Sequence, residues 1–235
     1  MLTMIKIEKT ETSGWETAIR GMRNPLNSWD KSDSRYCDGY CDSQGCYDCA
    51  YYRDGGECAH PAPYPEDRAG YIIGPADLGL MKKLAASGND HGKFLRMILV
   101  TADLTAPLYW WKEYDTYKVG TVANSCSTMH KIQAKEFTLA DFSNEHLEED
   151  NQMILGLVIE QLNAARRVFN TTQDKEEWWQ MIQLLPSSYN QKRTVLLNYA
   201  VLKNIYHSRK NHKLDEWREF CRWIEGLPHS ELITE

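Results

Sequence analysis

The sequence predicts an α+β fold, in which a small sheet is combined with a predominantly helical C-terminal half. Two observations support this class. Apolar residues between positions 145 and 225 recur every three or four residues, as buried helix faces require, over four successive segments. Strand-like segments fall in the first half, at 4–9 and 94–104. Helices that follow the strands in this way are expected to segregate from the sheet.

The first half is expected to contain two strands and two helices. Residues 4–9 alternate between polar and apolar side chains, as in a strand, and residues 14–22 form a short helix that an Arg-Asn-Pro sequence stops. Residues 75–86 begin with proline at the first helical position and end at Ser-Gly, which predicts a second helix. Residues 94–104 are apolar and β-rich enough for a buried strand.

The second half is expected to be helical. Residues 145–170 carry the longest apolar stripe at three- and four-residue spacing. A second helix at 174–185 is closed by a proline, and a third at 193–210 has one apolar side. The last helix, at 214–225, ends at a Gly-Leu-Pro sequence.

Length and charge limit the class of protein. A chain of 235 residues with 42% hydrophobic side chains can bury a full core, so we expect a single domain over 1–235 with a Cys-rich inserted loop at 32–68. The net charge of −6 argues against general nucleic-acid binding and against anionic membranes. No apolar run reaches the roughly 18 residues of a membrane span, and the beginning of the sequence lacks a signal-peptide pattern, so the cytoplasm is the expected location.

Five of the seven cysteines fall in one polar segment, with the spacing C-x3-C-x4-C-x2-C-x8-C, and a histidine follows. Disulfides are disfavoured in a reducing compartment, whereas zinc ligation by thiolates would order a loop that has no core of its own. A structural zinc site, a polar loop without metal, and a disulfide or redox role all remain open. Only the pair at 46 and 49 has a common zinc spacing. The candidate ligands are Cys37, Cys41, Cys46, Cys49 and Cys58.

Residues 107–131 combine aromatic, charged and small polar side chains more densely than any other stretch, and Asn-Ser-Cys-Ser at 124–127 offers amide, hydroxyl and thiol groups. One interpretation is structural: an amphipathic helix at 106–119 with a buried aromatic face, then a turn and a second helix capped by residue 124 or 125. The other is a ligand site. A polar loop at 20–31 adds Arg23 among asparagines and serines, a mixture suited to holding a phosphate or carboxylate, although scattered surface arginines are commoner.

The order of these features resembles that of the flavin-dependent thymidylate synthases. That family has a histidine before a strand, an Ala-Pro entry to a helix, an Arg-His-Arg motif, and then Asn-Glu-x-Ser-x-Arg-Tyr. Here His91, the strand at 94–104, Ala106-Pro107 and the NSCSTMH sequence of 124–130 occur in the same order.

A second block extends the resemblance toward the C-terminus. The family shows Leu-Pro, then an asparagine that opens a long helix, and an arginine eleven residues later; Leu185-Pro186, Asn198 and Arg209 reproduce these intervals. The resemblance covers about residues 75–225, and the cysteine segment matches nothing in the family.

The resemblance implies an α+β subunit that assembles as a homotetramer with active sites between subunits. In this family, reduced FAD supplies a hydride and methylenetetrahydrofolate a carbon, and dUMP becomes dTMP without a covalent enzyme nucleophile. The protein positions the two ligands and lends charge to their phosphates. FAD, a pyrimidine nucleotide and folate are therefore the implied ligands. The alternative is a non-catalytic nucleotide-binding protein of the same fold that acts by sequestration or in an assembly.

The resemblance also assigns roles to individual residues. Ser127 and Asn124 are the expected groups at the catalytic centre, where the serine positions the nucleotide without attacking it. The expected cofactor-binding residues are Lys118, Tyr117, His91 and Asn198. The expected substrate-binding residues are Arg209, Ser125 and His130, to which the polar loop adds Arg23.

Several charged members of the family pattern are replaced. The Arg-His-Arg motif falls on residues 116–118 or 117–119, where Lys118 is the one cation, and the next motif has Ser125 and Met129 in place of glutamate and arginine. A further family arginine becomes Ala200. Arginine binds phosphate in a bidentate manner that lysine only approximates and that methionine or alanine cannot supply.

Overall fold

The computed structural model describes residues 5–36 and 71–235, and these residues fall into two compact units. The first unit comprises the residues up to Glu11 together with Thr101–Leu197 and Arg209–Cys221. The second comprises Thr12–Val100, Asn198–Ser208 and Arg222–Glu235. The single domain with an insert at 32–68 stays a prediction. The candidate zinc ligands Cys37, Cys41, Cys46, Cys49 and Cys58 lie outside the described residues.

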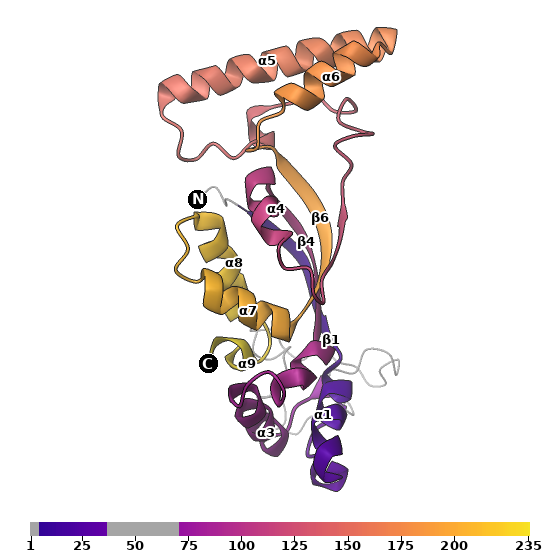
Figure 1. The fold of residues 1–235 in the computed structure, drawn as a ribbon, viewed down its shortest axis with the longest axis vertical. Helices are drawn as coiled ribbons and strands as arrows, with labels where there is room; N and C mark the ends of the chain where they lie inside the picture. Colours follow the sequence, from indigo (N-terminus) through magenta and orange to yellow (C-terminus); the bar gives the residue numbers. More distant parts are fainter. Residues whose placement is uncertain (1–4, 37–70) are drawn as a thin grey trace, which may run out of the picture. The chain divides into compact units, whose positions relative to one another are not determined.

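The main sheet has four strands in the order β1-β4-β6-β5, formed by Lys6–Ser13, Leu99–Pro107, Asn190–Asn198 and Val122–Ser125 (Figure 1). In β4, every second residue is buried, from Val100 to Ala106. β5 pairs antiparallel with β6. Helices and a small sheet together confirm the α+β class.

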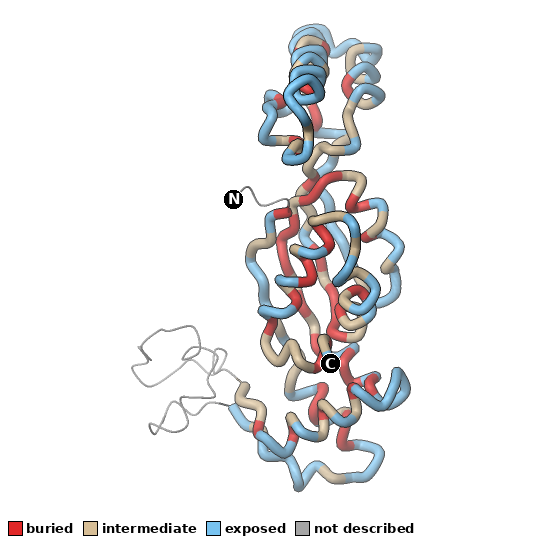
Figure 2. The backbone as a smooth tube through the Cα atoms, turned by 90° about the vertical axis from the view of Figure 1, so that its left-hand side faces the viewer, coloured by how far each residue is buried: buried red, intermediate tan, exposed pale blue. Residues whose placement is uncertain are grey.

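The first unit is built around aromatic side chains and a helical hairpin. Helix α4 (Leu108–Tyr114) packs its tryptophans against residues of α8 (Asp215–Glu225), with the rings of Trp110 and Trp217 4.7 Å apart. Helices α5 (Glu149–Thr172) and α6 (Lys175–Leu184) lie side by side with their buried residues between them (Figure 2). The Asn163 side chain ties the preceding loop to α5 through the backbone N–H and carbonyl of Phe137, at 2.9 and 2.8 Å.

The second unit packs α1 (Trp15–Arg23) and α3 (Pro75–Ala86) against the 3₁₀ helix η4 (Gly92–Met97). It also holds α7 (Tyr199–Arg209) as far as residue 208, and α9 (Glu231–Thr234). Shorter 3₁₀ helices in the described residues include η1 (Asn24–Leu26), η2 (Trp29–Lys31) and η5 (Leu139–Asp141). The strands β2 (Arg35–Tyr36) and β3 (Tyr71–Ile72) pair antiparallel on the two sides of residues 37–70.

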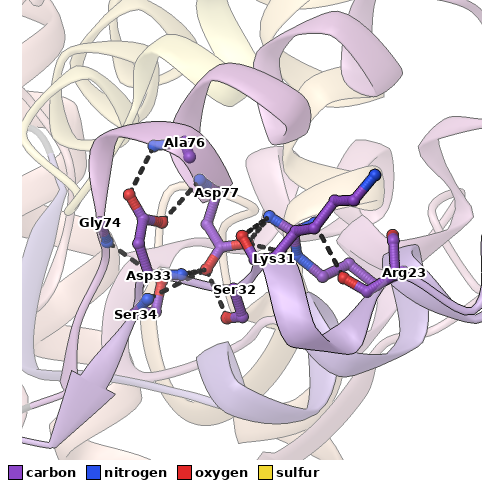
Figure 3. Close-up of polar contacts among 9 residues, drawn as sticks. Arg23, Lys31, Ser32, Asp33, Ser34, Gly74, Ala76 and Asp77 are labelled. Carbon is purple, nitrogen blue, oxygen red and sulfur yellow. Dashed lines mark hydrogen bonds and ion pairs between the residues drawn. The ribbon is translucent and has the colours of Figure 1, made fainter.

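A buried carboxylate organises the second unit (Figure 3). Asp77 on α3 is fully buried and accepts hydrogen bonds from Arg23 Nε at 2.7 Å and from the hydroxyls of Ser32 and Ser34, each at 2.6 Å. Asp33 in turn accepts the backbone N–H of Asp77 at 3.0 Å. Because each group has its partner, the network fixes the loop at 31–34 on the first turn of α3.

This network predicts a specific loss of stability in acid. Burial raises the pKa of Asp77, but hydrogen bonds from Ser32, Ser34 and Arg23 outweigh that effect, so its pKa lies below the ordinary value. Such a group stabilises the folded chain above its unfolded pKa of about 4, and the contribution is lost as the pH falls through the folded pKa. Urea unfolding between pH 7 and 3 should therefore show a steeper loss below about pH 4 in the wild type than in Asp77→Asn. An identical pH dependence of the two proteins would contradict this assignment.

Several predicted elements are confirmed and three are not. The helices expected at 14–22, 75–86, 174–185 and 214–225 are present with ends shifted by at most one residue. The expected second helix after position 124 is wrong, because residues 122–125 form β5.

The other two errors concern strands. The first part of the helix expected at 193–210 is strand β6, whose residues 191, 195 and 197 are buried at the two-residue period of a strand. The strand expected from 94 begins only at 99, since η4 occupies the residues before it.

Candidate functional site

The first unit has a cavity of about 370 Å³ where α4 ends and β5 begins. Gly120, with φ of 78°, provides the left-handed conformation that turns the chain back toward β5, which few other residues adopt without strain. Two predicted cofactor residues, Tyr117 and Lys118, line the cavity together. The complete lining is Tyr114, Asp115, Tyr117, Lys118, Thr121 and Ala123.

Arg209 supports one wall of this cavity from behind. Its Nε donates to the Tyr117 hydroxyl at 2.9 Å, and its Nη1 donates to Glu113 Oε2 at 2.9 Å. The guanidinium carbon lies 4.9 Å from the centre of the Trp217 ring, and the Trp217 indole N–H donates to the same Glu113 oxygen at 3.0 Å. Arg209, which the resemblance assigns to substrate binding, therefore contacts the cavity lining through Tyr117. Its charge is already paired with the Glu113 carboxylate.

A second arginine contacts another residue of the lining, Asp115. Arg193 Nη1 forms an ion pair with Asp115 Oδ1 at 2.7 Å, and its guanidinium lies 4.2 Å from the centre of the Trp111 ring. Lys118 is exposed and forms no ion pair within residues 5–36 and 71–235. Two cations held by acids and one available lysine give the cavity a modest positive charge, which favours an anionic ligand.

The residues predicted for the catalytic centre do not line this cavity. Asn124 and Ser125 are exposed on β5, where they pair with residues 194 and 193 of β6. Ser127 Oγ accepts the backbone N–H of His130 at 2.9 Å, and both residues are exposed. These four side chains are therefore exposed on β5 and on the segment that follows it, and their roles stay predictions.

The second unit has a larger cavity of about 740 Å³, and His91 lies in its wall. Apolar side chains from α1, α3 and η4, such as Met22, Leu84 and Phe94, make most of its surface, and Lys93 and Asp90 contribute charge. A wide, mostly apolar cavity with a few polar groups is the usual form of a small-molecule site.

Two other predicted residues of the second unit are held by internal contacts. Arg23 is 5% exposed, and in addition to Asp77 its guanidinium donates to the carbonyls of Ser28 and Lys31 at 3.1 and 2.9 Å. This geometry favours the structural interpretation of Arg23. Asn198 is 7% exposed, and its Oδ1 accepts the backbone N–H of Val201 at 3.0 Å at the beginning of α7, as expected of a helix-opening asparagine.

The sequence did not single out Glu113 or Tyr114 as site residues. The Glu113 carboxylate accepts hydrogen bonds from both Arg209 and Trp217, and Tyr114 is a buried residue of the cavity lining. In the sequence, both residues lie within the amphipathic helix expected at 106–119, and only the fold shows that this segment borders a cavity.

Neither a metal cluster nor a membrane-spanning helix is found in the described part of the chain. Among these residues no three His, Cys, Asp or Glu side chains form a group that would hold a metal ion. Among them, too, no helix is long and apolar enough to cross a membrane.

The fold is similar to that of solved flavin-dependent thymidylate synthases. The chain superimposes on the flavin-dependent thymidylate synthase ThyX from Helicobacter pylori complexed with FAD and dUMP, with a TM-score of 0.63, 13% identity, and 97% of each chain covered. A second structure of the Helicobacter pylori enzyme with FAD and dUMP gives a TM-score of 0.62 at 12% identity, covering 98% of this chain and 96% of the other. No protein-family model and no curated protein matches the sequence.

Proposed function

We propose that the protein binds a pyrimidine nucleotide of the dUMP type together with FAD, and acts on the nucleotide as a thymidylate synthase-like enzyme with a folate carbon donor. The observation that carries this proposal is the likeness of fold over 97% of both chains to an enzyme solved with these two ligands. A second support is that Tyr117, Lys118 and Arg209, which the resemblance assigns to ligand binding, line or support one cavity.

The residues present are compatible with FAD. The rings of Tyr114 and Tyr117 in the lining of the smaller cavity suit a flat ring system, and Lys118 in the same lining suits a phosphate group. When bound, FAD would supply the hydride chemistry of the reaction. The residues of this chain would orient the ligands and balance their charge: Lys118 by direct attraction, and Arg209 by holding the ring of Tyr117 in place.

A specific observation supports the non-catalytic alternative. Glu113 pairs with Arg209 at 2.9 Å, and Asp115 pairs with Arg193 at 2.7 Å, so two of the arginines nearest the smaller cavity are already neutralised. A site with less positive charge stabilises a developing negative charge less well. A nucleotide-binding protein without turnover, acting by sequestration or within an assembly, is the second candidate function.

Binding of dUMP to the purified protein tests the proposal. Trp111 and Trp217 lie against the two supporting arginines, so a ligand in the smaller cavity is expected to change their fluorescence in a saturable way. The titration is made with dUMP and, as a control for nonspecific anion binding, with inorganic phosphate. If dUMP binds no better than phosphate at millimolar concentration, the nucleotide proposal is wrong. Turnover with FAD, a reductant and methylenetetrahydrofolate then separates the enzyme from the non-catalytic binder.

A further inference from the structure

One wall of the smaller cavity contains a polar group that lacks a partner. Tyr114 is 2% exposed, and its hydroxyl makes no hydrogen bond within the described part of the chain, although the residue lines the cavity. A buried hydroxyl without a partner loses its hydrogen bonds to water and gains nothing in return. Such a group is commonly explained by a ligand or an ordered water that completes it.

The surroundings of the Tyr114 hydroxyl determine which kind of ligand atom would form a hydrogen bond with it. Burial raises the pKa of the Tyr114 hydroxyl, and the nearby Asp115 carboxylate adds to this effect against the opposing influence of Arg193. The hydroxyl therefore stays protonated and is available as a donor, which calls for an acceptor such as a carbonyl oxygen.

The neighbouring residue offers the opposite function. Asp115 lines the same cavity, and its side chain is half exposed. Arg193 occupies its Oδ1 at 2.7 Å, while its Oδ2 accepts no hydrogen bond from any residue that the structure describes. A carboxylate oxygen of this kind accepts from an N–H group. The cavity thus presents one donor and one acceptor on consecutive residues.

We propose that Tyr114 and Asp115 bind the imide edge of a planar heterocycle, with the hydroxyl donating to a ring carbonyl and the carboxylate accepting from the adjacent ring N–H. This inference deepens the proposed function and rests on it. The imide edge is shared by the uracil base of a nucleotide and by the isoalloxazine ring of a flavin, so two sources of the same chemistry are considered. Lys118 at the same cavity is placed to attract a phosphate of either ligand.

The hydroxyl is covered by its neighbours, so the ligand must displace part of the cavity rim. Lys118 lines the same cavity, is exposed and has no ion pair within the described residues, so no salt bridge has to break for its side chain to move. An ordered water on the hydroxyl is the competing explanation, and a variant that removes only the hydroxyl distinguishes the two.

The test is Tyr114→Phe, with Tyr206→Phe as a matched change outside the cavity. Binding of dUMP, 2′-deoxyuridine, FAD and riboflavin is measured for each full-length protein, together with the melting temperature. Because the hydroxyl has no partner in the free chain, Tyr114→Phe should leave the melting temperature unchanged or raise it. Affinity for the bound heterocycle should fall about tenfold, while Tyr206→Phe should bind as the wild type does.

The four ligands show whether the bound imide edge belongs to the nucleotide base or to the flavin. A methylated ligand then tests the role of Asp115. Weakened binding of dUMP and deoxyuridine assigns the edge to the nucleotide base, and weakened binding of FAD and riboflavin assigns it to the flavin. Where the uracil ligands bind, 3-methyl-2′-deoxyuridine, which lacks the ring N–H, should bind about tenfold more weakly than deoxyuridine.

The two proposals fail in different ways. A wild-type protein that binds dUMP or FAD, with the same affinity in Tyr114→Phe, overturns this inference and leaves the proposed function standing. A wild-type protein that binds none of the four ligands overturns both.

Discussion

Replacing Asp77 by asparagine is expected to lower the free energy of unfolding by about 3–5 kcal/mol, the usual effect of leaving a buried charge without its partner. Arg23 is 5% exposed, and its guanidinium lies 2.6 Å from the Asp77 carboxylate. Without that carboxylate, water cannot solvate the buried positive charge. Asparagine keeps the shape of the side chain but has one acceptor oxygen in place of two, while Arg23 and the hydroxyls of Ser32 and Ser34 all donate to this position.

Chemical unfolding measures this effect, with Asp30→Asn as the control. Asp30 is an exposed acid on η2, close in sequence to the same loop, and its replacement should change the free energy of unfolding by less than about 0.5 kcal/mol. The double variant Arg23→Met, Asp77→Asn should be more stable than Asp77→Asn alone, because it removes the unpaired charge. Equal stability of Asp77→Asn and Asp30→Asn would show that the network contributes little.

Arg209→Met is expected to act on both stability and ligand binding. The change removes two hydrogen bonds, to Tyr117 and Glu113, and leaves the Glu113 carboxylate with the Trp217 indole N–H and a nearby His212. We expect the free energy of unfolding to fall by about 2 kcal/mol. Affinity for dUMP is expected to fall at least tenfold, because the Tyr117 ring at the cavity is then no longer held.

Two further variants separate these effects. Arg209→Lys keeps the positive charge but lacks the planar group that reaches Tyr117 and Glu113 together, so it should recover only part of the affinity. Arg218→Met, which removes a half-exposed arginine from α8, should leave dUMP binding unchanged. Unchanged dUMP affinity in Arg209→Met would exclude Arg209 from the site.

The sequence predicted the fold class because the helical signals are local. Proline at position 75 and Asp174 before α6 mark the helix starts where the structure has them. The strand β6 was missed because Leu197 at its end continues the three- and four-residue spacing of the apolar residues of α7, so the change of period near Asn198 was hidden.

The site was only partly predictable, because its geometry depends on contacts between distant segments. Interval matching identified Tyr117 and Arg209, which are 92 residues apart and hydrogen-bonded. It gave no indication that Glu113 pairs with Arg209 or that Tyr114 lacks a partner, since both facts follow from packing. Arg23 shows that one set of residue types can serve two purposes: the segment rich in phosphate-binding residue types also builds an internal network with Asp77, which only the fold shows.

The absorption spectrum of the purified protein with FAD, recorded before and after dUMP is added, shows whether the protein is a flavoprotein that also binds the nucleotide. We expect FAD to be retained through desalting and its visible bands to shift when dUMP binds, because both ligands occupy the protein together. A protein that neither retains nor perturbs FAD, and whose spectrum does not respond to dUMP, would contradict the proposed flavoenzyme and leave a shared fold with another use.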